Sequence, residues 1–474
     1  MSNAAPARSC ALRLVGDVRR RDARARDILR TSEELSKLDR RDRDLATRLV
    51  MGVVATRGAL DARIDAHRSR GRLEPRVRDA LRVSAYELLW MDTPPEVAVS
   101  QGVALVREVA PRATGLANAV LRHIAEDRRE LGEALRRTRK GVSDVDECAL
   151  VAGMPAWLAL AIRKSWDLAL LRKLVLSHLD PAPVYVAANL ALHTDAEARE
   201  LLERAGLEPQ DAGLPGSWAL SAPAGLAASG LVGNVDVLPC DLAAQMVCAI
   251  AAPAPGTSLL EVGQGRGTKT ILLEDSALRQ GGSAQILGTD VLPGKVRAAG
   301  ERAKSAGIGE WVEELDFDAR WLSADDLPAP LARTFDTVFV DAPCSGTGTM
   351  RRHPEICWDL EEHAVDPTTP GSLPQLQLQI LRAAASRVAP GGRLVYSTCS
   401  VLRAEDEDII EAFLSGPEGG DFRIAPIAAA PGVASLAPEA RELVLSHVSG
   451  NGLFRTSPAA DAPDGHFCCR FARK

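Results

Sequence analysis

Residues 258–270 read SLLEVGQGRGTKT, an apolar run that ends in a glycine-rich turn and leads into a segment of helical character. Three similar runs follow, each separated from the next by enough residues for a helix: QILGTD at 285–290, TVFVD at 337–341 and GRLVYST at 392–398. Short apolar runs that alternate with helix-length segments are typical of buried strands in a parallel sheet. The second half of the chain is therefore predicted to be an α/β domain.

The turn at residues 263–269 predicts a ligand site. Glycines let the backbone turn tightly and approach a ligand, although an ordinary glycine-rich turn is the alternative. Asp290 ends the second run, where an acidic side chain can accept hydrogen bonds from both hydroxyls of a ribose. Asp318, after a third strand, is expected to read an adenine amino group or to be a plain surface residue. NAD and S-adenosylmethionine both fit, and the expected cofactor-binding residues are Gly263, Gln264, Gly265, Arg266, Gly267, Thr268, Lys269, Asp290, Asp318 and Asp341.

The stretch DAPCSGTG at 341–348 favours S-adenosylmethionine. Cys344 follows the fourth strand and Cys399 follows the next one, so both cysteines are expected at the same edge of the sheet. A lone buried cysteine is usually an inert apolar filler, which is our interpretation of the other seven. Carbon 5 of a pyrimidine is a poor nucleophile, and its methylation requires a thiolate to add to carbon 6. Two strand-end cysteines therefore predict this chemistry.

Two long stretches carry a family resemblance. DAPCSGTGTMRRHPEICW at 341–358 and QLQLQILRAAASRVAPGGRLVYSTCSVLRAEDEDIIEAFL at 375–414 resemble the NOP/Sun family of RNA 5-methylcytosine methyltransferases. The resemblance implies a Rossmann-like class I methyltransferase domain that uses S-adenosylmethionine. It also implies that Cys399 is the nucleophile, that Cys344 helps to release the product, that Asp341 contacts the cytosine edge and the cofactor, and that Lys269 lies near both.

The glycine-rich turn departs from this family at one point. The family usually has an Ala-Pro-Gly-Gly-Lys-Thr type of loop, whereas residues 265–270 read GRGTKT and lack the proline. Lys269 and Thr270 are retained, so we expect a different loop geometry and the same cofactor.

The first part of the chain reads as helices. From Asp22 to about Glu130, apolar residues recur at spacings of three and four, and turn signals at Gly71, Pro94-Pro95 and Pro111 divide five or six helices. The runs VRDALRVSAYELLWMDTPPEVAVSQGVALV at 77–106 and GLANAVLRHI at 115–124 resemble the NusB-like RNA-binding domain. The two resemblances together imply that the partner is small-subunit ribosomal RNA.

Charge and composition limit the kinds of partner and the cellular location that this chain can have. Residues 1–140 hold 30 Lys and Arg against 20 Asp and Glu, a net charge of +10 within a chain of −6. This asymmetry indicates a polyanion partner, with a solvated arginine-rich surface as the alternative. An apolar fraction of 46% in 474 residues, without a membrane-length apolar run, a signal sequence or a CxxC pair, indicates a cytoplasmic protein without a metal site. We expect a monomer that does not bind membranes.

The chain is long enough for several domains. The expected division is a helical RNA-binding domain at 1–140, a small mixed connecting domain at 141–240 and the methyltransferase domain at 241–474.

Three other functions compete with this interpretation. A DNA 5-methylcytosine methyltransferase would use Cys344 of the Pro-Cys motif as its nucleophile, and the Thr-Cys-Ser motif around Cys399 argues against it. A non-catalytic RNA-binding or antitermination-type factor is favoured by the basic helices and the altered loop. A methyltransferase that acts on another RNA is the third.

Overall fold

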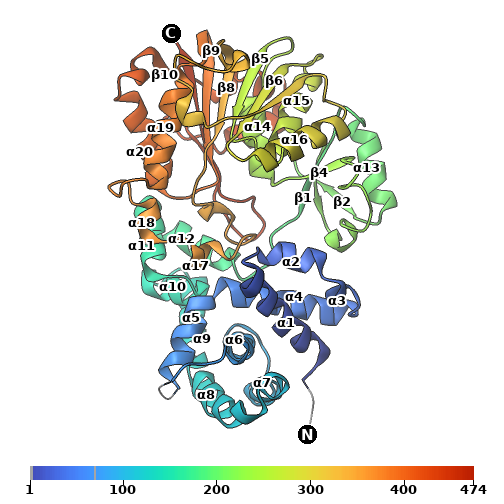
Figure 1. Ribbon diagram of the computed structural model, residues 1–474, viewed down its shortest axis with the longest axis vertical. Coiled ribbons are helices and arrows are strands. Elements are labelled where there is room, and N and C mark those ends of the chain that lie inside the picture. The colour runs from blue at the N-terminus through green and yellow to red at the C-terminus, as the bar shows by residue number, and fades with distance from the viewer. Residues whose placement is uncertain (1–3, 69–70) are drawn as a thin grey trace. The chain divides into compact units, whose positions relative to one another are not determined.

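The chain divides into two units. The computed structural model describes residues 4–68 and 71–474. Contacts group the described residues up to Ala182 with Thr349–Glu362, which we call the helical unit, and Pro183–Gly348 with His363–Lys474, which we call the sheet unit (Figure 1). The domain limits expected at 140 and 240 lie inside these units, and the division into three domains stays a prediction.

The helical unit confirms the all-helical prediction. Its centre is built from α1 (Pro6–Arg21), α4 (Arg40–Ala55), α6 (Pro75–Trp90), α7 (Pro95–Val109) and α8 (Thr114–Glu126), which pack on one another. Three of them begin with a proline, which suits the first turn of a helix because the N–H there lacks an intrahelical acceptor. The other helices are α2 (Ala25–Thr31), α3 (Glu33–Ser36), α5 (Arg57–Ala66), α9 (Arg128–Arg139), α10 (Val145–Ala152), α11 (Ala156–Ser165), α12 (Leu168–Ser177) and α17 (Ile356–Asp359).

The sheet unit confirms the α/β prediction. The four apolar runs form β5 (Ser258–Val262), β6 (Gln285–Asp290), β8 (Phe335–Asp341) and β9 (Val388–Thr398). With β7 (Val312–Asp316) they make a parallel sheet in the order β9-β8-β5-β6-β7. Two strands that the sequence analysis did not predict, β12 (Phe467–Arg473) and β10 (Phe422–Ile424), extend it beyond β9 in antiparallel pairing, and β11 (Phe454–Arg455) pairs with β12.

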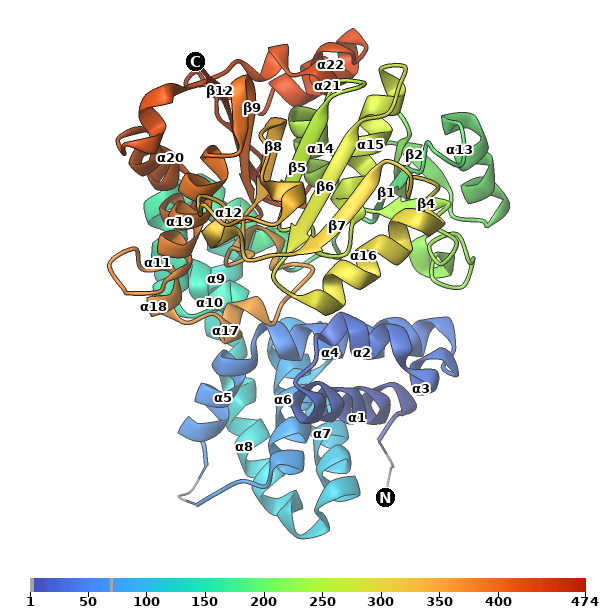
Figure 2. The same ribbon diagram turned by 45° about the horizontal axis from the view of Figure 1, so that its top comes forward.

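Helices cover both faces of this sheet (Figure 2). Alternate strand residues point to opposite faces, so Leu259 and Leu260 of β5 belong to different cores. The core with Leu259 lies under α14 (Leu242–Ala251), α15 (Thr268–Arg279) and α16 (Pro293–Ser305), together with α21 (Pro431–Ala434) and α22 (Pro438–Leu445). The core with Leu260 lies under α19 (Leu373–Ala385) and α20 (Glu407–Leu414).

A smaller antiparallel sheet precedes the large one. Its order is β2-β3-β1-β4, formed by β1 (Tyr185–Ala188), β2 (Pro209–Asp211), β3 (Ser217–Leu220) and β4 (Val237–Pro239), and α13 (Asp195–Arg204) packs on it. A further short helix, α18, spans Glu362–Val365. Across residues 4–68 and 71–474, no helix has the length and apolar character required to span a membrane.

Candidate active site

The glycine-rich turn connects β5 to α15 and lies against the end of β8. Gly263 has φ +84°, and a Cβ atom there would lie 2.3 Å from the carbonyl oxygen of Asp341. Only glycine fits such a close approach of two backbones. Gly267, with φ +74°, is the N-cap of α15. The turn therefore leaves its backbone at the carboxyl edge of the sheet, where ligands of open α/β sheets bind.

Asp290 supports the turn from the neighbouring strand. Its carboxylate accepts hydrogen bonds from the backbone N–H groups of Gly265, at 3.1 Å, and Leu292, at 3.0 Å. Val291 and Leu292 beside it are 60% and 50% exposed, which is unusual for large apolar side chains. The sequence analysis did not single out these two residues. The pattern that could have identified them is an apolar pair directly after the acidic residue that ends a strand.

The other residues of the turn have separate partners. The buried Gln264 side chain donates to Thr270 Oγ1 at 3.2 Å, and Thr268 Oγ1 accepts from Arg302 at 2.8 Å. Arg266 is exposed. Asp318 caps a short 3-10 helix and pairs with Arg320, within 3.0 Å of its Nε. This pairing agrees with the surface alternative for Asp318, and its role in adenine recognition stays a prediction.

Lys269 and Asp341 form an ion pair between the turn and the end of β8. The Nζ atom of Lys269 lies 2.6 Å from Oδ2 of Asp341. Burial lowers the pKa of Lys269, but the Asp341 carboxylate outweighs this effect and the pKa lies above its ordinary value. Glu261, one strand away, is fully buried, and burial raises its pKa to about 8 although Thr270 donates a hydrogen bond to it.

The structure brings the two predicted cysteines together. Strands β8 and β9 pair in parallel, with Asp341 opposite Ser397, so the loops that follow them start side by side. The Sγ atoms of Cys344 and Cys399 are 3.4 Å apart. The hydrogen bond with Cys399, burial and the nearby Glu405 raise the pKa of Cys344 well above its ordinary value. Once ionised, Cys344 is therefore a stronger base than an ordinary cysteine thiolate.

The two cysteine loops are also joined through their backbones. The N–H of Gly348 donates to the carbonyl oxygen of Cys399 at 2.9 Å, and the N–H of Val401 donates to Thr347 Oγ1 at 3.0 Å. A Cβ atom on Gly348 would lie 2.0 Å from the carbonyl oxygen of Gly465. These contacts hold the loop that carries Cys344 against the loop that carries Cys399.

Of the other seven cysteines, all but Cys240 are buried, as expected for apolar fillers. Burial raises the pKa of Cys10 to about 11 and that of Cys357 to about 12. In the part of the chain that the structure describes, no cluster of three or more His, Cys, Asp or Glu side chains is arranged to hold a metal ion.

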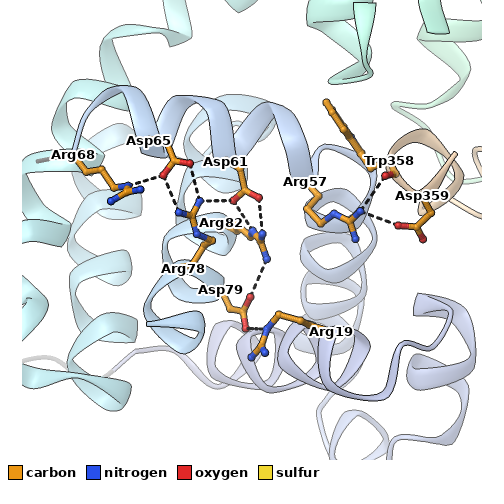
Figure 3. Close-up of polar contacts among 10 residues, drawn as sticks. All are labelled: Arg19, Arg57, Asp61, Asp65, Arg68, Arg78, Asp79, Arg82, Trp358 and Asp359. Carbon is orange, nitrogen blue, oxygen red and sulfur yellow. Dashed lines mark hydrogen bonds and ion pairs between the residues drawn. The ribbon is translucent and has the colours of Figure 1, made fainter. Parts of the chain in front are cut away.

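Many arginines of the basic helical unit are paired with acids (Figure 3). Arg82 lies between Asp61 and Asp79, at 2.6 and 3.1 Å. Arg78 in turn bridges Asp61 and Asp65, at 3.1 and 2.8 Å. The chain of ion pairs ends at Arg68 on one side and Arg19 on the other. These arginines hold helices together, so the surplus positive charge resides on other residues of the unit.

The segment directly after the Pro-Cys motif packs inside the helical unit. The indole N–H of Trp358 donates to the carbonyl oxygens of Ala55 and Gly153, at 2.9 and 3.1 Å. A Cβ atom on Gly58 would lie 2.1 Å from the Trp358 ring. Arg57 donates to Asp359 at 2.8 Å (Figure 3).

Comparison with known proteins gives consistent results for both parts of the chain. Residues 249–471 match the family described as 16S rRNA methyltransferase RsmB/F, and residues 5–126 match the NusB family. Ribosomal RNA small subunit methyltransferase B of Xylella fastidiosa strain 9a5c is 32% identical over 388 residues, which are 80% of this chain and 83% of that protein. The protein of the same name from Klebsiella pneumoniae strain ATCC 700721 is 28% identical over 407 residues, 84% of this chain and 88% of that one.

Solved structures share the fold. The crystal structure of PH0851 covers 99% of both chains with a TM-score of 0.75 and 21% identity. A methyltransferase homolog from Pyrococcus horikoshii covers 69% of this chain and 98% of its own, with a TM-score of 0.53 and 18% identity.

Proposed function

This chain belongs to the RsmB/F family of 16S rRNA methyltransferases, and from this premise we propose that it methylates carbon 5 of a cytosine through a covalent bond to Cys399. The observation that carries the proposal is the 3.4 Å separation of two strand-end thiols, Cys344 and Cys399, beside a glycine-rich turn. Carbons 5 and 6 of the ring are neighbours, so a pair of thiols at this separation can serve both of them.

The two cysteines have different tasks. The Cys399 thiolate adds to carbon 6, which forms a carbon–sulfur bond and makes carbon 5 an enamine nucleophile. Carbon 5 then takes the methyl group and must lose its proton. Loss of that proton restores the double bond, and its electron pair expels Cys399 as a thiolate. Cys344 takes the carbon 5 proton as a thiolate, and its raised pKa makes that thiolate a strong base.

Asp341 is assigned to the cytosine ring. Lys269 engages Oδ2 of Asp341 at 2.6 Å, and no residue in the described part of the chain donates to Oδ1. Oδ1 can therefore accept a hydrogen bond from the exocyclic amino group of the cytosine. The carboxylate also stabilises the ring nitrogen while that nitrogen is transiently protonated. Lys269 fixes the orientation of the carboxylate.

The turn and its surroundings fit S-adenosylmethionine. This cofactor supplies a methyl group on a positively charged sulfur, which is the electrophile that the enamine requires. Gly263 gives close access to the backbone, Asp290 accepts from the ribose hydroxyls, and the exposed Val291 and Leu292 offer an apolar surface to the adenine ring.

Calorimetry tests the assignment of Asp290. Asp290→Asn keeps the shape of the side chain but removes acceptor capacity for two ribose hydroxyls, so affinity for S-adenosylmethionine should fall by about one to two decades. The control is Asp316→Asn, because Asp316 ends the neighbouring strand opposite Asp290 and is exposed. Equal affinity of folded Asp290→Asn and wild type would remove Asp290 from the cofactor site.

We further propose that the partner is small-subunit ribosomal RNA, that the basic helical unit contributes to its binding, and that the protein acts in the cytoplasm as a monomer. The net charge of +10 on residues 1–140 supports salt-dependent binding.

Methyl transfer tests the substrate class. Protein is incubated with tritium-labelled S-adenosylmethionine and either unmodified small-subunit ribosomal RNA or duplex DNA. We expect label in 5-methylcytosine of the RNA alone, and none when Cys399→Ala is used. Label in DNA would favour the DNA-type alternative, and cofactor binding without transfer to either substrate would favour the non-catalytic one.

A further inference from the structure

We propose that Glu405 is a positioning residue that clamps the two cysteine loops and keeps the thiols at the separation needed for product release. The inference rests on the proposed roles of Cys344 and Cys399. Glu405 ends a 3-10 turn, Arg403–Glu405, that lies between β9 and α20 in the sequence, and it is fully buried.

Four hydrogen bonds converge on the Glu405 carboxylate. Its Oε1 accepts from the backbone N–H of Ser345, at 2.8 Å, and from Gln377 Nε2, at 2.9 Å. Its Oε2 accepts from the hydroxyls of Ser345 and Ser400, each at 2.5 Å. An ionised carboxylate offers about four acceptor sites, so the capacity of this group is filled.

These bonds reach the residues next to both thiols. Ser345 follows Cys344 and Ser400 follows Cys399 in the sequence, so one carboxylate holds both loops. Gln377 extends the clamp, because its Nε2 also donates to the carbonyl oxygen of Pro343 at 2.9 Å, on the other side of Cys344. The loops are also joined directly, because the Ser400 hydroxyl lies 3.3 Å from that of Ser345 and 3.2 Å from that of Thr347. Loss of Glu405 removes the acceptor that the hydroxyls of Ser345 and Ser400 share.

The directions of these bonds show why an amide cannot replace the carboxylate. Ser400 Oγ accepts from the N–H of Leu402 at 3.0 Å, so its own hydrogen points to Glu405. Glutamine at position 405 has the same shape, but it turns an N–H toward the hydroxyls of Ser345 and Ser400, which donate there in the wild type. The opposite orientation of the amide turns the N–H toward the Ser345 N–H and Gln377, so in either orientation at least one bond to Ser345 is lost.

The clamp has a specific consequence for the reaction. Attack on carbon 6 needs Cys399 alone, whereas removal of the carbon 5 proton needs Cys344 beside the same ring. Loosening of the loops should therefore slow release more than attack, and the covalent protein–RNA complex should accumulate although Cys344 is present. A residue that only contributes to stability would not change the ratio between the rate of attack and the rate of release.

The first experiment compares Glu405→Gln with Glu274→Gln. Glu274 is also buried, and within residues 4–68 and 71–474 its carboxylate accepts only from the N–H of Ala284, at 3.2 Å, so its variant controls for loss of a buried carboxyl. In the presence of RNA and S-adenosylmethionine, Glu405→Gln should lower kcat with little change in the KM for RNA and should raise the denaturation-resistant complex by about tenfold, the scale of one or two lost hydrogen bonds to a charged group. Glu274→Gln should match wild type.

The second experiment does not depend on catalysis. Diamide accepts two hydrogens from a pair of thiols and leaves a disulfide, which mass spectrometry detects as a Cys344–Cys399 crosslink. If Glu405 holds the loops, the crosslink should form about tenfold more slowly in Glu405→Gln than in wild type or Glu274→Gln. Equal crosslinking rates, together with an unchanged fraction of covalent complex, would overturn the clamp even if Cys399 is the nucleophile.

Two smaller substitutions test the same proposal if Glu405→Gln does not fold. Ser345→Ala and Ser400→Ala each remove one hydroxyl donor from Glu405. Both should raise the fraction of covalent complex and slow the crosslink, by less than Glu405→Gln does. If the crosslink slows but no variant of the cysteines affects methylation, the clamp stands and the proposed function fails.

Discussion

The two units contain acidic side chains whose pKa values are shifted in opposite directions. In the helical unit, Asp65 is 45% exposed, and hydrogen bonds from Arg78 and Arg68 hold its pKa below the ordinary value. In the sheet unit, burial raises the pKa of Glu261 and of Asp275 to about 8. Acids near solvent with arginine partners favour the charged form, whereas acids buried with few donors favour the neutral form.

The two arrangements also differ in redundancy. Asp61, Asp65 and Asp79 of the helical unit each have two arginine partners (Figure 3). In the sheet unit, the single carboxylate of Glu405 accepts from both cysteine loops. A network with shared partners tolerates the loss of one member, but a single acceptor that serves several donors does not. The comparison predicts where substitutions and pH act most strongly.

The largest expected effect is a loss of stability in the sheet unit as the pH rises from about 4.5 to about 8. An acid with a raised folded pKa binds more protons when folded than when unfolded over this range, so its contribution to stability is present at low pH and is lost as the pH rises. Each unit of pKa shift corresponds to ~1.4 kcal/mol. Glu261→Gln should flatten this decline, because the amide stays neutral and can still accept from Thr270.

Hydrogen exchange followed by mass spectrometry measures this effect in the full chain, since peptides from each unit report separately. Between pH 5 and pH 8, and after correction for intrinsic exchange rates, peptides of β5 and α15 should lose protection in wild type and lose less in Glu261→Gln. Peptides of α5 and α6 serve as the internal control. An identical pH slope in wild type and variant would contradict the raised pKa of Glu261.

A moderate effect is expected for Arg82→Ala in the helical unit. Arg82 is mostly buried, but its removal leaves Asp61 paired with Arg78 and Asp79 paired with Arg19. Because both acids keep a partner, the free energy of unfolding should fall by about 1–2 kcal/mol rather than by the 3–5 kcal/mol typical of an orphaned buried charge. Urea unfolding followed by circular dichroism measures it, and a loss beyond that range would show that the shared partners do not compensate.

The smallest effect is expected for Arg30→Ala. Arg30 and Asp27 are 62% and 50% exposed and lie 3.2 Å apart on one face of α2. Exposed pairs of this kind contribute about 0–1 kcal/mol. The urea midpoint should therefore match that of wild type within error. A clear shift would mean that an exposed ion pair contributes as much to stability as the buried pairs of Arg82.

The sequence revealed those parts of the site that follow from strand order. Cys344 and Cys399 each follow a buried strand, and parallel strands bring their carboxyl ends to one edge, so their proximity was predictable. Glu405 was not predictable, because its meeting with Ser345 spans 60 residues and depends on the tertiary path of two loops. Val291 and Leu292 were missed because exposure is not visible in a sequence.

The fold shows the same limit. Strands β5, β6, β8 and β9 were predicted from their apolar runs, which are buried on both faces. Strand β12 was missed because nothing local in FCCRFAR shows that it pairs antiparallel with β9. The packing of Trp358 in the helical unit was also missed, since the segment that carries it continues the Pro-Cys motif of the sheet unit in the sequence.

The covalent complex between protein and RNA tests the central claim most directly. Cys344→Ala, Cys399→Ala, the double variant and the control Cys10→Ala are incubated with unmodified small-subunit ribosomal RNA and S-adenosylmethionine, and the products are separated by denaturing electrophoresis. We predict a stable complex for Cys344→Ala, no complex for Cys399→Ala or the double variant, and the wild-type result for Cys10→Ala. A complex that requires Cys344 and persists without Cys399 would contradict the assignment of the nucleophile.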